Sequence, residues 1–312
     1  MRIAIFGVGA VGGYFGGRLA NAGHDVIFVA RGETLSRLQT HGLEVNSVLG
    51  DFVITHPQVV ADPIEAGPAD LVLLAVKAQH VREAGRSLAP LIGPETAVIP
   101  LQNGIEAPSL LAEILGPEHV MGGLCKIFST RLAPARIQHV GFPPALIFGE
   151  LGQASTERVE RIRSALEPAS GMSVVTPDDI EAALWDKFLF VASLGGVGAV
   201  ARAPAGVLRE VLETRRMLRA AMEEIVAIAR KRKIALGDDA PDRAFELIDG
   251  LPAEATASMQ RDVMAGEPSE LEYQTGTVVR YGEESGVPTP VHSAIYAALL
   301  PSELRAAGKF AF

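Results

Sequence analysis

The chain has 312 residues, of which 48% are hydrophobic and 21% are charged. This composition is typical of a globular protein and excludes disordered, collagen-like and coiled-coil classes. A net charge of −9 argues against a binding surface for nucleic acid or for anionic membranes. The single cysteine, Cys125, excludes an internal disulfide and a multi-cysteine metal cage, and it favours a reducing compartment.

We expect a soluble, cytoplasmic protein. The chain runs from Met1 directly into an apolar segment, without the basic stretch and cleavage site of a secretory signal. The longest uncharged run, 188–201, is shorter than the ~20 residues of a membrane-spanning helix, and glycines interrupt it.

The first half of the chain alternates short apolar runs with helical stretches, the pattern of a parallel sheet with crossover helices. Strands are predicted over residues 2–6, 25–30, 71–76, 97–100, 119–125, 136–140 and 145–149. After these, helical periodicity dominates, and helices are predicted over residues 156–167, 178–203, 213–233, 240–251, 270–285 and 291–300. We therefore predict an α/β fold with a parallel-sheet domain in residues 1–150 and an all-helical domain in residues 151–312. The boundary is expected between Gly149 and Thr156.

A glycine-rich loop follows the first predicted strand and opens a helix expected over 14–22. Its residues are Gly7, Val8, Gly9, Ala10, Val11 and Gly12. In this pattern the first glycine permits a tight turn, the second lets the backbone approach a pyrophosphate, and the third lets helix pack closely on strand. The strand before the loop and the strand at 25–30 complete the β-α-β unit that such a motif requires. A dinucleotide site is therefore favoured over a turn without a ligand.

Two basic residues point to NADP rather than NAD. The strand at 25–30 is followed by Arg31, where an NAD enzyme would carry Asp or Glu for the ribose 2′-hydroxyl. A guanidinium suits a 2′-phosphate, which it can bind bidentately. Lys77 follows the strand at 71–76, at the edge of the sheet where ligands bind. An ordinary solvated charge is the alternative interpretation of each.

Two further residues, Asn103 and Lys187, are weaker candidates from chemistry alone, and a third, Glu270, is not a catalytic candidate on that ground. Asn103 follows the strand at 97–100 and suits a nicotinamide ribose or a substrate carbonyl, although an Asn-Gly turn explains it equally well. Lys187 stands in an almost wholly apolar segment, where it suits a general acid or a lysine at the rim of a core helix. Glu270 is explained structurally by a helix N-cap at Ser269 with acidic residues in the first turn.

Taken together, the chain resembles the ketopantoate reductase (2-dehydropantoate 2-reductase) family. The matching segments span nearly the whole chain in the right order. They are the glycine loop, Arg31, Val76-Lys77-Ala78, Gln102-Asn103-Gly104, Trp185-Asp186-Lys187, Ser258-Met259-Gln260-Arg261-Asp262, Glu270-Leu271-Glu272-Tyr273 and Gly286-Val287-Pro288-Thr289-Pro290.

The resemblance implies a Rossmann-type NADP-binding domain and a helical substrate domain. It implies NADPH-dependent reduction of a 2-oxo acid, most simply 2-dehydropantoate to pantoate in pantothenate biosynthesis. It assigns Lys187 as the general acid, Glu270 as its partner and a substrate contact, Ser258 to the substrate carboxylate, and Asn103 to a place between cofactor and substrate. We expect no nucleic-acid, membrane or metal partner, and a homodimer stays open.

The chain departs from the family at three positions. The family usually carries asparagines four and eight residues after the lysine, where this chain has Val191 and Gly195, and a further asparagine aligns loosely with Ala205. Fewer amides predict a drier and roomier pocket that selects weakly among 2-oxo acids. The alternatives are a reductase of bulkier apolar 2-oxo acids, resembling D-mandelate dehydrogenases, and a catalytically silent NADP-binding sensor.

Overall fold

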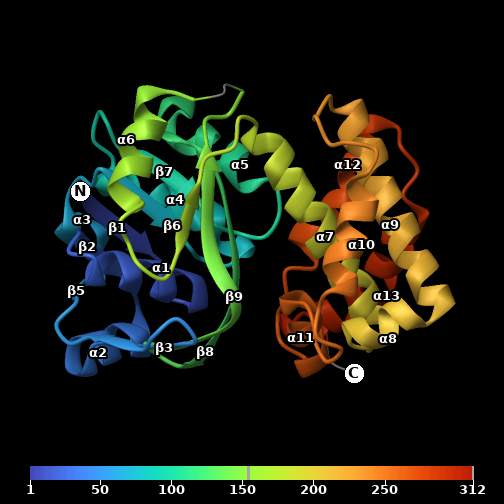
Figure 1. The fold of residues 1–312 in the computed structure, drawn as a ribbon, viewed down its shortest axis with the longest axis horizontal. Helices are drawn as coiled ribbons and strands as arrows, with labels where there is room; N and C mark the ends of the chain where they lie inside the picture. The colour runs from blue at the N-terminus through green and yellow to red at the C-terminus, as the bar shows by residue number, and fades with distance from the viewer. Residues whose placement is uncertain (153–154, 311–312) are drawn as a thin grey trace. The chain divides into compact units, whose positions relative to one another are not determined.

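The computed structural model describes residues 1–152 and 155–310 (Figure 1). The chain forms two compact units, one of residues 1–102 and 106–180 and one of residues 103–105 and 181–312. The first unit is α/β. In the second unit, all the secondary-structure elements that the structure describes are helices. The predicted fold class is therefore confirmed.

A five-stranded parallel sheet forms the centre of the first unit, in the order β5-β2-β1-β6-β7. The bounds are Arg2–Phe6 for β1, Asp25–Val29 for β2, Gln58–Val60 for β5, Leu71–Leu74 for β6 and Ala97–Pro100 for β7. Alternate residues of β1 enter two cores on opposite faces, with Ile3 and Ile5 in one and Ala4 and Phe6 in the other. Burial on both faces explains why these strands are continuously apolar. The strand order reverses between β1 and β6, which is where such sheets bind ligands.

Helices cover this sheet on both faces. Tyr14 and Phe15 of α1 pack in one core, and Val81 of α4 and Leu111 of α5 pack in the other. The bounds are Ala10–Asn21 for α1, Gly32–His41 for α2, Pro63–Ala66 for α3, Val81–Ser87 for α4 and Ala107–Leu115 for α5, with 3₁₀ turns η1 at Ala78–His80, η2 at Ala89–Leu91 and η3 at Pro117–His119. The helix expected over 14–22 thus begins four residues earlier, directly after Gly9.

A second sheet in the same unit has the order β10-β9-β3-β4, with β8 paired to β9. The bounds are Leu43–Ser47 for β3, Phe52–Ile54 for β4, Gly122–Ala133 for β8, Arg136–Gly149 for β9 and Ser173–Val175 for β10. The predicted separate strands at 136–140 and 145–149 are wrong, because β9 runs continuously through both. The pairing of β8 with β9 shifts register between Lys126 and Phe128, opposite Pro143 and Pro144. Proline lacks the N–H that a ladder needs, so the sequence there resembles a strand end.

The first unit ends at Ile180, later than the boundary expected between Gly149 and Thr156. Helix α6, Glu157–Leu166, buries its apolar side chains in the same core as β1, and β10 pairs in parallel with β9. Arg158 and Thr156 donate hydrogen bonds to buried Glu150. Burial alone raises the pKa of this carboxyl, but the hydrogen bonds from Arg158 and Thr156 and the charge of Arg158 together lower it. Residues 151–180 therefore belong to the α/β unit, and residues 151–312 are not wholly helical.

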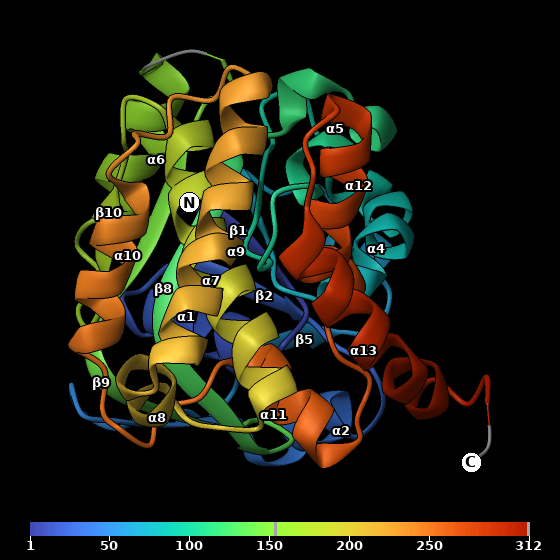
Figure 2. The ribbon, with the colours of Figure 1, turned by 90° about the vertical axis from the view of Figure 1, so that its right-hand side faces the viewer.

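The second unit is built from helices, with α9 packed against α12 and α13 (Figure 2). The bounds are Ile180–Ala201 for α7, Ala205–Glu210 for α8, Leu212–Lys231 for α9, Ala240–Asp249 for α10, Ser258–Ala265 for α11, Thr277–Ser285 for α12 and Pro290–Ala306 for α13, with a π-helical turn, η4, at Glu272–Gly276. The single helix expected over 270–285 is thus divided into η4 and α12. The short helices α8 and α11 were not predicted.

In the part of the chain that the structure describes, α7 is the one helix long and apolar enough to span a membrane. It has 22 residues, and the mean hydropathy of its most apolar window is 1.4. Two observations identify it as a core helix. Within the structure, 67% of that window is buried, and Gly196 lies against the side chain of Ile295 on α13.

Candidate functional site

The glycine loop contains two kinds of glycine. A Cβ at Gly7 would lie 2.9 Å from Val76 Cγ1, and a Cβ at Gly12 would lie 2.0 Å from the carbonyl oxygen of Gly7. The fold itself therefore requires glycine at both positions. A Cβ at Gly9 would have no heavy atom within 4 Å, and the φ of this residue is −85°, which any residue adopts. The space at Gly9 is open, which fits close approach of a pyrophosphate to the backbone.

The N-terminus of α1 faces the same place. Gly9 is the N-cap residue, no side chain caps the helix, and the first turn carries no acidic residue. The first N–H groups of a helix have no partner within the helix, and the helix dipole adds partial positive charge. Ala10, Val11 and Gly12 supply these N–H groups. Their backbone therefore suits an anion such as a phosphate.

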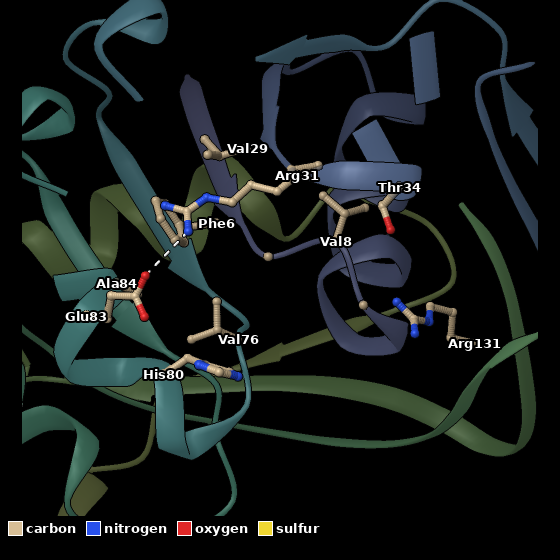
Figure 3. A pocket seen from close by; sticks show the side chains of 13 residues that line it. Phe6, Val8, Val29, Arg31, Thr34, Val76, His80, Glu83, Ala84 and Arg131 are labelled. Atoms are coloured by element: carbon tan, nitrogen blue, oxygen red, sulfur yellow. Dashed lines mark hydrogen bonds and ion pairs between the residues drawn. The ribbon is translucent and has the colours of Figure 1, made fainter. Parts of the chain in front are cut away.

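A cavity of about 360 Å³ lies beside this loop, at the carboxyl ends of β1, β2 and β6 (Figure 3). Its size is within the range of small-molecule sites. The lining residues are Phe6, Gly7, Val8, Gly9, Val29, Ala30, Arg31, Thr34, Val76, His80, Glu83, Ala84 and Arg131. Gly7, Val8, Gly9 and Arg31 thus lie where the sequence predicts. The side chains of Ala10 and Val11, and Lys77, are not part of the lining.

Arg31 does not stand alone in this cavity. Its Nη1 lies 3.4 Å from Glu83 Oε1 on α4, and both side chains are exposed, by 65% and 71% (Figure 3). Solvent screens such a pair, so it contributes little to stability. A 2′-phosphate bound to Arg31 would nevertheless lie close to the Glu83 carboxylate.

Arg131 is a cavity residue that the sequence interpretation missed. It comes from β8, and Figure 3 shows it beside Thr34, away from the Arg31–Glu83 pair. Lys77 was expected as the second cation, but the cavity takes its second cation from a different sheet. No motif marks Arg131, because only the pairing of β8 with β9 carries it to the glycine loop.

Gln102 adds a polar group at the carboxyl end of β7. Its Nε2 donates to the carbonyl oxygens of Leu74 and Val76 at 2.9 and 3.0 Å, so the side chain is fixed across the sheet edge. Its Oε1 is buried, and none of the described residues donates a hydrogen bond to it. Buried acceptors are rarely left without a donor. The glycine loop, the helix N-terminus, Arg31 and this acceptor fit a dinucleotide with a carboxamide group.

In the second unit, α7 fixes the segment around Lys187. The ring of Trp185 packs edge-on to Phe188 and near Tyr281, at 6.2 Å in each case. Asp186 accepts a hydrogen bond from Arg243 on α10 at 2.7 Å, and hydrogen bonds to Asp239 and Asp186 raise the pKa of Arg243. Lys187 itself is half-buried. The neighbours of Lys187 are thus held by α10 and α12, which limits the motion of its backbone.

Glu270 lies just before η4 and is 8% exposed. Its Oε2 accepts hydrogen bonds from Asn103 Nδ2 at 3.4 Å and from Gln274 Nε2 at 3.3 Å. Ser269 Oγ accepts from the Leu271 N–H at 3.1 Å, but η4 begins at Glu272 with Leu271 as its N-cap and no side chain caps it, so the N-cap expected at Ser269 is wrong. The structure therefore brings two predicted site residues, Asn103 and Glu270, into contact, although they are 167 positions apart in sequence.

Two other candidates are less closely connected. Ser258 is the first residue of α11 and is exposed. Among residues 103–105 and 181–310, no hydrogen bond joins Ser258 or Lys187 to the Asn103–Glu270 pair. The roles given to them by resemblance remain expectations.

The three departures from the family have different surroundings. Gly195 faces Met259 and Gln274, because a Cβ there would lie 3.3 Å from Met259 Cε and 3.5 Å from Gln274 Oε1. Val191 is half-buried on α7. Ala205 begins α8, is 1% exposed, and its N–H donates to the carbonyl of Ala255. The amide nearest to Gly195 is therefore supplied by η4.

Known sequences and structures match the chain along nearly its whole length. The model of the family described as Ketopantoate reductase PanE/ApbA matches residues 3–153, and that of Ketopantoate reductase PanE/ApbA C terminal matches residues 179–303. The chain is 30% identical over 301 residues to the uncharacterized oxidoreductase YkpB of Bacillus subtilis, covering 96% of this chain and 98% of that protein.

Solved structures share the fold. The crystal structure of 2-dehydropantoate 2-reductase from Geobacter metallireducens has a TM-score of 0.90 and 30% identity, covering 97% of this chain and 100% of that one. The ternary structure of D-mandelate dehydrogenase with NADH and anilino(oxo)acetate has a TM-score of 0.89, covering 98% and 99% of the two chains. At 21% identity, the second likeness shows the fold alone. The family matches in both halves, together with the relatives that span the whole chain, show that this protein is an oxidoreductase of the ketopantoate reductase family.

Proposed function

We propose that the protein reduces a 2-oxo acid to the 2-hydroxy acid with NADPH in the cytoplasm, with 2-dehydropantoate as the first substrate to test. The observation that carries the proposal is the contact between Asn103 and Glu270 in the unit that also carries Lys187. An amide, a carboxylate and an ammonium group are what recognition and protonation of a small polar oxo acid require. A purely nucleotide-binding sensor would have no need of them.

The α/β unit supplies the proposed cofactor site. The backbone of Gly7, Val8 and Gly9 and the N-terminus of α1 bind the pyrophosphate, and Arg31 binds the 2′-phosphate. Arg131 adds positive charge on another side of the same cavity. When bound, NADPH supplies the hydride that reduces the carbonyl carbon.

The helical unit supplies the proposed proton. Lys187 donates a proton to the carbonyl oxygen as negative charge develops on it, which yields the alcohol of the 2-hydroxy acid. Glu270, held by Asn103, accepts a hydrogen bond from the substrate and complements the charge of the lysine. Ser258 donates to the substrate carboxylate. These roles extend the family resemblance to this chain, residue by residue.

The proposal is tested by steady-state oxidation of NADPH against a panel of 2-oxo acids. The panel contains 2-dehydropantoate, 2-oxoisovalerate and a bulky aromatic 2-oxo acid, with NADH in parallel. We expect turnover with NADPH and less than a thousandfold preference in kcat/KM for 2-dehydropantoate, because Val191 and Gly195 provide no amide. Strong preference for the aromatic acid would instead favour the second candidate, a reductase of bulkier 2-oxo acids. Tight NADPH binding without turnover of any acid would favour a sensor.

A further inference from the structure

Gln274 is a buried amide that the proposed mechanism does not use. It is 1% exposed, and its Nε2 donates to Glu270 Oε2 at 3.3 Å. The same oxygen accepts from Asn103 Nδ2 at 3.4 Å. Two amides from distant segments therefore hold one oxygen of the carboxylate. The position of this oxygen therefore depends on both amides.

The π-helical turn explains how this amide is presented. Glu270 and Gln274 are four residues apart, and the Gln274 N–H donates to the Glu270 carbonyl at 3.0 Å, so their side chains are neighbours on one turn. The turn then widens, because the Gly276 N–H donates to the carbonyl of Leu271, five residues back. Single π-helical turns within helices are frequent at functional sites.

A second network anchors the same turn. Glu272 accepts hydrogen bonds from Arg280 and from the hydroxyl of Tyr296. A Cβ at Gly276 would lie 3.1 Å from Glu272 Oε2, so glycine gives this network its space. With Glu272 held in this way, η4 is a rigid support for Gln274.

The other end of the Gln274 amide faces α7. A Cβ at Gly195 would lie 3.5 Å from Gln274 Oε1, so a larger side chain at position 195 would compete with this amide for the same space. Residues four and eight positions after Lys187 share its face of the helix, which places Gly195 on that face. Because Gly195 has no side chain, the amide of Gln274 from η4 can occupy this space.

From this geometry we infer that Gln274 is a positioning residue for the reductase reaction and sets the orientation of Glu270 in place of an amide on α7. The inference rests on the proposed role of Glu270 in binding the 2-oxo acid. It assigns Gln274 no contact with the reacting atoms. The amide acts through the carboxylate, so its effect depends on Glu270 being present.

The test compares Gln274→Met with the parent. Methionine has nearly the same size but cannot donate a hydrogen bond, so the core stays filled. We expect kcat/KM for the best 2-oxo acid of the panel to fall roughly tenfold, the loss of one hydrogen bond to a charged group. The dissociation constant for NADPH and the thermal midpoint should stay near those of the parent. Gln39→Met, at an exposed glutamine of α2, is the matched control and should change none of these values.

A double-mutant cycle separates a positioning role from a structural one. In a Glu270→Ala background, adding Gln274→Met should lower kcat/KM less than twofold further. A rescue variant, Gly195→Asn combined with Gln274→Ala, supplies the amide from α7 and should recover most of the loss. Should Gln274→Met fail to fold, Gln274→Glu keeps the size and sets a second carboxylate against Glu270, with an expected loss of at least tenfold.

Equal losses in both backgrounds, or parent-like activity of Gln274→Met, would overturn the inference while leaving the proposed function intact. A parent chain that turns over no acid of the panel would overturn both.

Discussion

The glycine loop of the α/β unit and the surroundings of Glu270 in the helical unit are two candidate binding sites that are built in different ways. In the loop, a few consecutive residues offer backbone N–H groups, and packing requires two of the three glycines. Around Glu270, the side chain of Asn103 comes from a distant part of the sequence and meets those of Glu270 and Gln274, which are four residues apart. A site formed by consecutive backbone groups can be recognised in the sequence from a short motif. A site formed by side chains from separate segments can be recognised only once the fold is known.

This difference predicts that the largest catalytic effect comes from the helical unit. Lys187→Ala should lower kcat by about 10²–10⁴-fold, because a general acid acts in the transition state. The dissociation constant for NADPH should stay within twofold, since the glycine loop and cavity belong to the other unit. Lys231→Ala, at an exposed lysine of α9, is the control. Near-normal turnover of Lys187→Ala, measured by steady-state kinetics, would show that Lys187 has a structural role and is not the general acid.

Arg31→Ala tests whether the loop site selects its cofactor by charge. Removing the guanidinium should weaken NADPH binding roughly ten- to a hundredfold and leave NADH nearly unchanged, because only NADPH carries the 2′-phosphate. Fluorescence titration with both cofactors measures the two constants, and Arg37→Ala on the same helix is the control. An equal loss for both cofactors would show that Arg31 does not contact the 2′-phosphate.

Gly9→Ala and Gly12→Ala separate a glycine that the ligand requires from one that the fold requires. A methyl group at Gly9 enters open space, so thermal stability should not change, while NADPH and NADH should both bind about tenfold more weakly. A methyl group at Gly12 collides with the Gly7 carbonyl, so this variant should be strongly destabilised. Unchanged cofactor binding by Gly9→Ala would mean that the pyrophosphate does not approach this backbone.

The limits of prediction from the sequence follow the same division. Strands β1, β2, β6 and β7 of the first sheet were predictable, because burial on both faces makes Ile3, Ile5 and their neighbours continuously apolar. The edge strand β5, which has only three residues, was not predicted. The short strands β3 and β4 were not predicted, because β3 contains polar residues and ends in Asn46 and Ser47, and β4, although apolar, has only three residues. Pro143 and Pro144 divide β9 in the sequence but not in the structure.

The candidate site divides in the same way. Gly7, Gly9 and Arg31 were predicted as cofactor-binding residues, because such roles depend on local backbone and on the end of a strand, and the structure places all three in the lining of one cavity. Arg131 and Gln274 were missed, because one depends on how a hairpin folds back and the other on a π-helical turn. The sequence shows the four-residue spacing of Glu270 and Gln274, but it shows neither the π-helical turn nor the path of the β8–β9 hairpin.

Tyr296→Phe tests the rigidity of η4, on which the side-chain site depends. Burial first, and then its hydrogen bond to Glu272, raises the pKa of Tyr296 to about 12. The pKa of Tyr296 in the folded protein is thus above its unfolded value near 10. The protonated hydroxyl therefore contributes its full stabilisation of the folded state below pH 10, and this contribution is lost as the pH rises toward 12. The free energy of unfolding of the variant should be about 1 kcal/mol lower than that of the parent at pH 8, and this difference should be smaller at pH 11. A deficit that is constant across this range in denaturant titrations would contradict the assignment.

Glu83→Gln should give the smallest effect on cofactor binding. It tests how far the charge near Arg31 determines the preference of the cavity between NADPH and NADH. Glu83 Oε1 lies 3.4 Å from Arg31 Nη1 within the cavity, so the carboxylate competes with a 2′-phosphate for the same guanidinium and repels it. The amide keeps the shape and removes the charge. Because both side chains are largely exposed, screening limits the effect, and we expect the ratio of NADPH to NADH affinity to rise only two- to fivefold. The increase should fade at high ionic strength, and Glu113→Gln on α5 should not produce it. A ratio that falls instead would mean that Glu83 holds Arg31 in its binding orientation, so that this cation, like the Glu270 carboxylate, depends on a partner from a distant segment.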